Sequence, residues 1–394
     1  MKKTFLLVFI WVAIFSSAQS SSFQISYNGA TPQAKIAIDR AAEIWSNILV
    51  SNVPIKVNVN WINASSLGFL GVSISNGVKD FPNAPHSGVW YPSSLADAFA
   101  GVDLNPTETD MDVYLDSSRN WYFGIDGNGP GNQFDLVNVA LHEFAHGLGF
   151  YSIANIDDQG IGSFSLVIDP ATSLLASFPI PNLAGKPLIF DLFVENLQGE
   201  LLIDSSSFLN PSLGLANQFT SNNLFFNGTN AMNAYNNVRP RLYAPGVFSF
   251  GSSVLHLDES SFAPHSEDAL MTPNSSPSEA NHIPGPVTIG VLQDLGWSIN
   301  PTYIDENIAI KVDDISIYPN PVFTNATMSY DLRKKQHVNV SIYNLQGKKI
   351  TTLVDEVLSE GSYNTELEIN GLNGLYLVVL ESQYRKSVSK FLVK

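Results

Sequence analysis

The stretch Leu141–Phe150 constrains this chain most, because it contains the pattern His-Glu-x-x-His. On a helix, His142 and His146 lie four residues apart on one face, one above the other. Two imidazoles at that spacing can bind one zinc ion at about 2.0–2.1 Å. Glu143 lies beside them, where a carboxylate can take a proton from a metal-bound water. The pattern therefore predicts a zinc-dependent hydrolase, most simply a peptidase.

The residues around this pattern favour a helix. Asp135 is a suitable N-cap, and residues 136–148 contain no Pro and a single Gly near the end. Gly149 is placed to end the helix with a left-handed backbone. An apolar stripe runs along the side opposite the two histidines: Val137, Leu141, Phe144 and Leu148. This context argues against the alternative, an ordinary amphipathic helix with solvated histidines.

The first 18 residues have the pattern of a secretory signal peptide. A basic start is followed by an apolar run from Phe5 to Phe15, and the small residues Ser16–Ala18 precede Gln19. The run is short of the ~20 residues that cross a bilayer, and no later stretch is apolar enough, so we expect no transmembrane anchor. The chain has no cysteine, which excludes disulfides and thiolate zinc ligands.

The net charge of −16 is unevenly distributed. Residues 314–394 hold 9 Lys and Arg against 8 Asp and Glu, which leaves 11 against 28 in residues 1–313. A strongly acidic first part argues against nucleic-acid binding and suits an extracellular enzyme.

Residues 19–300 predict an α+β domain. Phe23–Tyr27 alternates like a strand, Thr31-Pro32 begins a helix, and Ile55–Trp61 alternates as a half-buried strand. The remaining expectations are an irregular segment at 62–110, a short strand at 112–115, a strand-like run at 188–193 and a helix at 287–295.

The loop before the histidine helix, residues 126–131, is rich in turn residues. Asp126, Asn128 and Asp135 offer oxygen ligands for calcium. Asx turns without a metal are the competing interpretation.

The composition changes at residues 301–313, which we interpret as a linker. Residues 314–394 then alternate densely, as in 338–343, 376–380 and 390–393, with turn residues between the runs. Short strands at this spacing predict an antiparallel, immunoglobulin-like all-β sandwich.

A catalytic zinc usually has three protein ligands and one open position. The stretch from His142 through Gly149 resembles the metzincin metallopeptidases, but Ser152 stands where their compact motif has a third His. The chain is similar to the leishmanolysin-like branch, in which the third His comes from far downstream, shortly before a Met-turn. That resemblance implies His256 as the third ligand and Met271, in Asp268–Pro273, as the Met-turn methionine.

Two other residues are alternatives for the third ligand. His265 follows His256 closely in the chain. Glu195 would complete the site as in the gluzincin class, where a downstream Glu is the ligand.

Residues 314–394 resemble the C-terminal sorting domain of the type IX secretion system. The resemblance rests on Ile317–Pro321, Tyr343–Lys348, Gly374–Val378 and Lys390. It implies binding to the type IX secretion machinery and export across the outer membrane, to the cell surface or the medium. A carbohydrate-binding or spacer sandwich is the alternative.

These observations predict a secreted zinc endopeptidase with one catalytic zinc, acting on protein or peptide substrates with Glu143 as general base. The first alternative is a non-catalytic metal-binding adhesin or binding module at the cell surface. A zinc hydrolase of non-peptide bonds is the second alternative. An intact Glu143 favours catalysis, because a site that only held metal would not need it.

Overall fold

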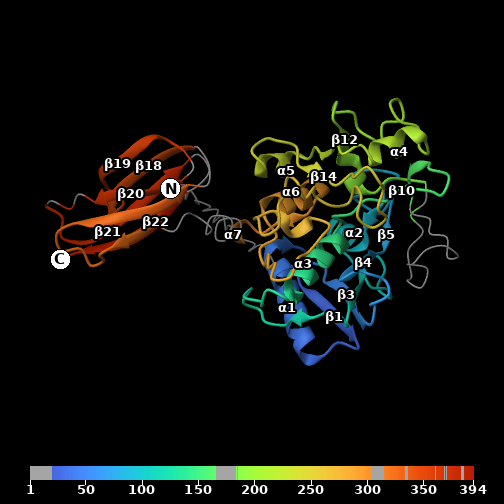
Figure 1. The fold of residues 1–394 in the computed structure, drawn as a ribbon, viewed down its shortest axis with the longest axis horizontal. Coiled ribbons are helices and arrows are strands. Elements are labelled where there is room, and N and C mark those ends of the chain that lie inside the picture. The colour runs from blue at the N-terminus through green and yellow to red at the C-terminus, as the bar shows by residue number, and fades with distance from the viewer. Residues whose placement is uncertain are drawn as a thin grey trace, which may run out of the picture. The chain divides into compact units, whose positions relative to one another are not determined.

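The computed structural model separates the chain into two compact units, Met1–Asn300 and Pro301–Lys394 (Figure 1). Each unit is described by itself. The structure describes residues 20–165, 183, 185–303, 315–332, 336–359, 361–367, 369, 371–382 and 386–394. The predicted signal peptide lies outside these residues, and so does the predicted linker beyond Tyr303.

A four-stranded sheet with the order β1-β3-β7-β4 is the base of the first unit. Strands β1 (Phe23–Asn28), β3 (Ile55–Ile62) and β7 (Met111–Asp116) are parallel, and β4 (Gly71–Ser75) pairs antiparallel with β7. Alternate residues of β3 are buried, as its sequence alternation predicted. Strand β4 is the last strand in this order, so it lies at an edge of the sheet.

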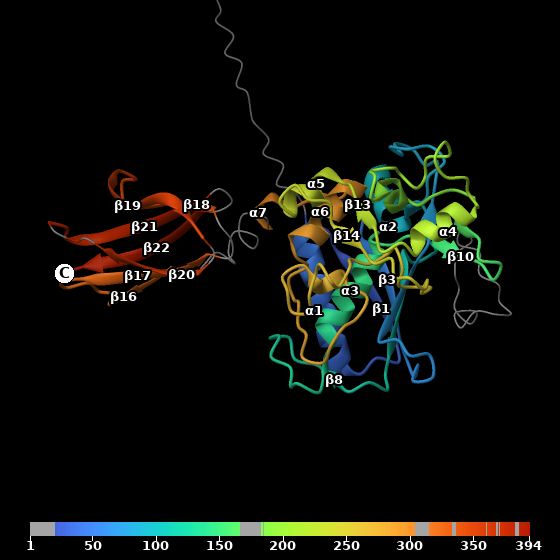
Figure 2. The ribbon, with the colours of Figure 1, turned by 45° about the horizontal axis from the view of Figure 1, so that its top comes forward.

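Helices α1 (Pro32–Ile48) and α3 (Leu136–Gly147) pack against each other beside the sheet (Figure 2). The Thr31 side chain accepts a hydrogen bond from a backbone N–H of the first turn of α1, as predicted for an N-cap. Trp45 of α1 is fully buried, and its indole N–H donates to the backbone oxygen of Leu141 in α3 at 3.1 Å. This contact fixes the histidine helix against the first helix of the domain.

Two sequence expectations were wrong. Residues 62–110 are not simply irregular, because they contain β4, β5 (Gly77–Val78), β6 (Tyr91–Pro92) and α2 (Ser93–Ala100). These elements are short, and β4 is ordered by its pairing with β7, which local pattern does not reveal. Residues 189–193 form a 3₁₀-helix, η1, and not a strand. The buried Asp191 carboxylate accepts the backbone N–H of Leu188 and stabilises that turn.

The rest of the first unit is built from short elements. The strands are β2 (Leu49–Val50), β8 (Trp121–Tyr122), β9 (Phe134–Asp135), β10 (Ala154–Ile156), β11 (Gly162–Phe164), β12 (Val194–Asn196), β13 (Leu224–Phe226), β14 (Arg241–Leu242) and β15 (Ser298–Ile299). The helices are α4 (Leu213–Phe219), α5 (Thr229–Ala234), η2 (Ala269–Met271) and α6 (Pro286–Leu295), the last as predicted.

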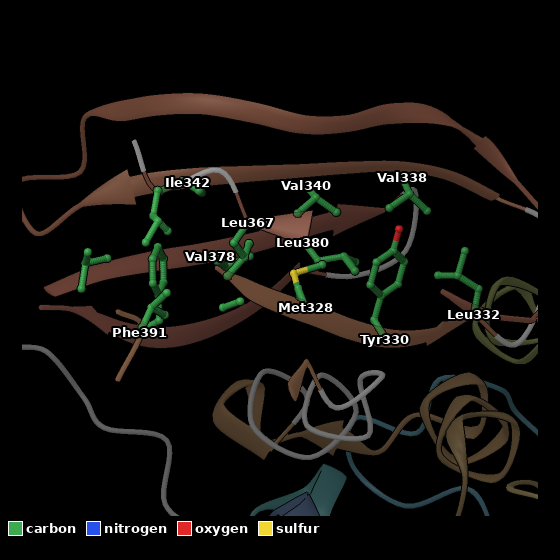
Figure 3. Packing of buried hydrophobic residues seen from close by; sticks show 14 residues of the cluster. Met328, Tyr330, Leu332, Val338, Val340, Ile342, Leu367, Val378, Leu380 and Phe391 are labelled. Atoms are coloured by element: carbon green, nitrogen blue, oxygen red, sulfur yellow. The ribbon is translucent and has the colours of Figure 1, made fainter. Parts of the chain in front are cut away.

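The second unit begins with the single helical turn α7 (Pro301–Tyr303) and continues as two antiparallel sheets. Their strands are β16 (Ser316–Tyr318), β17 (Ala326–Leu332), β18 (Gln336–Asn344), β19 (Lys349–Leu358), β20 (Gly361–Leu367), β21 (Gly374–Ser382) and β22 (Lys386–Val393). The sheet orders are β16-β17-β20 and β19-β18-β21-β22. Side chains from both sheets, including Met328, Val340 and Phe391, form one buried core (Figure 3). The prediction of an antiparallel sandwich is confirmed.

Within the described residues, no helix is both long and apolar enough to span a bilayer.

Candidate metal centre

Helix α3 carries the first two histidines of the site. The Asp135 side chain accepts the backbone N–H of Asn138 at 2.9 Å, so the predicted N-cap is confirmed. The predicted apolar stripe is fully buried. The rings of His142 and His146 are 4.6 Å apart between centroids. Because one helix face is anchored in the core, the two imidazoles are held on the other.

The structure brings His142, His146 and His256 together. Their Nε2 atoms are separated by 3.0 Å (His142 to His146), 3.1 Å (His142 to His256) and 3.2 Å (His146 to His256). Among the described residues, this is the one group of three or more His, Asp or Glu side chains with ligand atoms within 4.8 Å of one another. His256 lies 114 residues after His142 and 110 residues after His146, and the fold brings its Nε2 to theirs.

Backbone carbonyls fix the orientation of all three rings. Nδ1 of His142 lies 2.6 Å from the oxygen of Leu270, and Nδ1 of His146 lies 2.6 Å from that of Phe150. Nδ1 of His256 lies 3.0 Å from the oxygen of Ser252. A carbonyl oxygen can only accept, so each Nδ1 must carry the proton. In each neutral ring Nε2 is then bare, which means that it carries a lone pair and no hydrogen. No hydrogen is therefore available between the three Nε2 atoms, and their short separations are not hydrogen bonds.

A short antiparallel ladder places His256. The backbone N–H of Tyr243 donates to the oxygen of His256 at 2.8 Å, and the N–H of Val254 donates to the oxygen of Tyr243 at 2.7 Å. On its other side, the N–H of Leu257 donates to the oxygen of Met271 at 2.8 Å. His256 is therefore fixed by backbone bonds on both neighbouring segments.

Met271 is fully buried in η2. The segment it belongs to bonds to the site twice, because Leu270 accepts the Nδ1 proton of His142 and Met271 accepts the N–H of Leu257. The Asp268–Pro273 turn thus bonds to the His142 ring on α3 and to the backbone of Leu257, the residue after His256.

Burial keeps the three histidines neutral. It lowers the pKa of His142 to about 4 and that of His256 to about 3, in the latter case with help from His142. The pKa of His146 lies well below its usual value, first because of burial and then because of the two neighbouring histidines. Neutral imidazole is the form that binds a metal.

Glu143 is buried and follows His142 directly on α3. Burial raises the pKa of its carboxyl to about 8. Its side chain packs against Gly71 of β4, a contact that the sequence did not suggest.

The two alternative third ligands lie outside the histidine cluster. The Glu195 carboxylate forms an ion pair with Arg239 and accepts a hydrogen bond from Asn227 at 2.8 Å. His265 has a left-handed backbone, with φ of 64°, and its backbone N–H faces Glu279. Neither side chain is brought to His142 and His146.

The three residues considered for calcium have hydrogen-bonding roles of their own. Asp126 Oδ1 accepts the backbone N–H of Asn128 at 3.1 Å, which is an Asx turn. Asp135 Oδ1 caps α3 and also lies 2.9 Å from Nε2 of His282. Calcium binding by this loop stays a prediction.

Sequence reasoning missed the groups that orient the ligands. The carbonyls of Phe150, Ser252 and Leu270 carry no signal in their side chains. Gly71 stands at the start of the alternating run Gly-Val-Ser-Ile-Ser, which was a weak indication of a strand.

Comparison with known protein families identifies the second unit. Residues 316–394 match the secretion system C-terminal sorting domain. The chain therefore carries a type IX secretion sorting domain at its C-terminal end, and it is exported to the cell surface or secreted.

The first unit matches a different family. Residues 20–238 match the SPBPB7E8-like family model, a range that includes His142, Glu143 and His146 and ends before His256. A curated relative, the uncharacterized protein PB7E8.01 of Schizosaccharomyces pombe, is 27% identical over 177 residues. That match covers 40% of this chain and 30% of the relative, so the chain spans under a third of the relative's length. The family model covers more than half of the 394 residues, and the chain belongs to the SPBPB7E8-like family.

Proposed function

We propose that this exported protein is a zinc-dependent endopeptidase whose catalytic unit is similar to the leishmanolysin-like metzincins. The observation that carries the proposal is the convergence of three bare Nε2 atoms, together with a buried Glu143 that follows His142 on α3. The proposed activity belongs to residues 20–300, and the sorting domain supplies only the route out of the cell.

The three histidines fit a zinc ion. Zinc accepts imidazole nitrogen, and its catalytic sites commonly have three protein ligands and one open position. His142, His146 and His256 would hold it, because their Nε2 lone pairs face one another with no proton between them. The carbonyls on the three Nδ1 atoms are the outer partners expected of metal-binding histidines. When bound, zinc supplies Lewis-acid activation of a water and of the scissile carbonyl.

Glu143 would be the general base. It follows His142 directly on α3, and its carboxyl is held in a buried position. A group with a pKa near neutrality can accept a proton from the attacking water and later donate it to the leaving amine. Burial raises the pKa of the Glu143 carboxyl from its usual acidic value toward neutrality and slightly beyond, to about 8.

The edge position of β4 supports a peptide substrate, because among the described strands of this sheet β4 pairs with β7 on one side only. The N–H of Asp116 donates to the oxygen of Leu70 at 3.0 Å, which makes these two residues a hydrogen-bonded pair between β7 and the start of β4. In antiparallel pairing the direction of the backbone groups alternates, so Gly71 and Ser73 point their N–H and C=O groups away from β7. An extended peptide can pair with such groups. Since Gly71 contacts Glu143, a peptide paired here would pass beside the catalytic carboxyl.

The test is zinc content together with hydrolysis of casein and gelatin. The exported protein is compared with its Glu143→Ala variant, each with and without a chelator. We expect one zinc per chain in both proteins. Hydrolysis should be chelator-sensitive in the first protein and at least about 100-fold slower in the variant. Zinc without hydrolysis of any peptide would favour the binding module or a non-peptide substrate. A chain that binds no zinc would refute the proposal.

A further inference from the structure

The Glu143 side chain packs against Gly71 of the edge strand β4. A methyl group built on Gly71 would lie 2.6 Å from Glu143 Oε1, 2.7 Å from its Cγ and 2.8 Å from its Cδ. Real Cβ atoms essentially never come within 3.0 Å of a heavy atom outside their own and the two adjacent residues. The Glu143 side chain therefore occupies the space that any other residue at position 71 would need.

Space, and not backbone conformation, is what requires glycine here. The φ angle of Gly71 is not positive, so an L-residue could adopt its backbone conformation. Gly131 of the same unit differs in this respect, because a Cβ there would have nothing within 4 Å. At position 71 the closest atoms, and thus the first obstacle to a side chain, belong to Glu143.

We propose that Gly71 is a positioning residue for the reaction. Its missing side chain leaves the space beside β4 that the Glu143 side chain occupies. The inference deepens the proposed function and rests on it for its kinetic consequence. The three heavy atoms nearest to a methyl group built on Gly71 all belong to Glu143, and none belongs to His142 or His146.

The main test is Gly71→Ala, examined first as a crystal structure of the metal-free protein. We expect the Glu143 carboxyl to move by about 1 Å or more while the three histidine rings stay in place. A displacement of that size can reduce a rate about 100-fold. We therefore expect kcat to fall by about 10- to 100-fold, with KM and zinc affinity within about twofold of the parent. An unmoved carboxyl or an unchanged kcat would overturn the proposal.

Two comparisons separate positioning from general damage. Gly131→Ala adds the same methyl group where there is room, and it should leave kcat and the melting temperature unchanged. Gly71→Ala should lower the melting temperature by about 2–8 °C when Glu143 is present and by less than about 1 °C in the Glu143→Ala background. An equal fall in both backgrounds would show that the substitution acts on the strand and not on Glu143, which contradicts the proposal.

These readouts also separate the two proposals. If the parent protein hydrolyses no peptide, the proposed function fails and the kinetic part fails with it. The crystal structure and the melting temperatures of the metal-free variants still decide whether Gly71 holds Glu143 in place.

Discussion

The burial of the three histidines leads to a prediction about pH and zinc affinity. Protons compete with zinc for imidazole, so metal affinity usually falls as the pH falls below the pKa of the ligands. Three ordinary histidines with a pKa of about 6.5 would weaken zinc binding about 8-fold each between pH 7 and pH 5.5, and about 600-fold together. In this structure the pKa of His142 is lowered to about 4 and that of His256 to about 3, with His146 also lowered.

The lowered pKa values remove most of this loss of zinc affinity. Groups whose pKa lies well below 5.5 hold almost no proton anywhere between pH 7 and pH 5.5, so there is little to displace. We therefore expect the dissociation constant for zinc to change by less than about twofold over this range. Below about pH 4 the histidines begin to protonate, and affinity should then fall steeply.

Glu143 must be removed from the measurement, because its raised pKa gives it a proton that a nearby zinc would displace. The assay is therefore competition with a fluorescent chelator of known pH dependence, carried out on Glu143→Gln at pH 7.0, 6.3 and 5.5. A loss of affinity of 100-fold or more in this variant would mean that the imidazoles titrate like exposed ones, and the reasoning from burial would be refuted.

Three further predictions use other parts of the structure. His256→Ala should lose zinc on dialysis, whereas His265→Ala should keep one zinc per chain by mass spectrometry of the metal. Asp135→Ala removes the cap of α3 and should cost about 1–2 kcal/mol of unfolding free energy in a denaturant titration, while Asp135→Asn, which keeps an acceptor, should cost less. Deletion of residues 316–394 should leave the protein inside the producing cell, as measured by immunoblot of cell and medium fractions.

Local signals predicted the elements whose residues decide their own structure. Helix α3 was predictable because its cap, its apolar stripe and its terminal glycines all agree, and the structure shows it from Leu136 to Gly147. Three strands of the C-terminal sandwich, β18, β21 and β22, were predictable because the runs 338–343, 376–380 and 390–393 lie between turn residues, and the structure places each run within one of these strands. In both cases pattern and propensity point the same way.

The elements that were missed depend on partners far away in the chain. Strand β4 has five residues, two of them Ser and one Gly, so its propensity is low. It is a strand because β7, about 40 residues later, offers a row of backbone groups to pair with. Similarly, the run at 189–193 is apolar enough for a strand. The buried Asp191, which accepts bonds from Leu188 and Ser152, turns it into a 3₁₀-helix instead.

The third histidine shows where sequence spacing stops being informative. The distance between His142 and His146 is set by helix geometry, so the sequence alone specifies it. The position of His256 is set by backbone hydrogen bonds to Tyr243 and, through the neighbouring Leu257, to Met271, and none of these bonds depends on which side chain stands at 256. Nothing in local composition separates His256 from His265, nine residues later. What distinguishes them is that the oxygen of Ser252 accepts the Nδ1 proton of His256 and directs its Nε2 to the other two rings. A ligand recruited in this way can be predicted only by resemblance or by building the fold, because the segment that carries His256 must first be placed against α3, more than 100 residues earlier, as the contact between His142 Nδ1 and the oxygen of Leu270 shows.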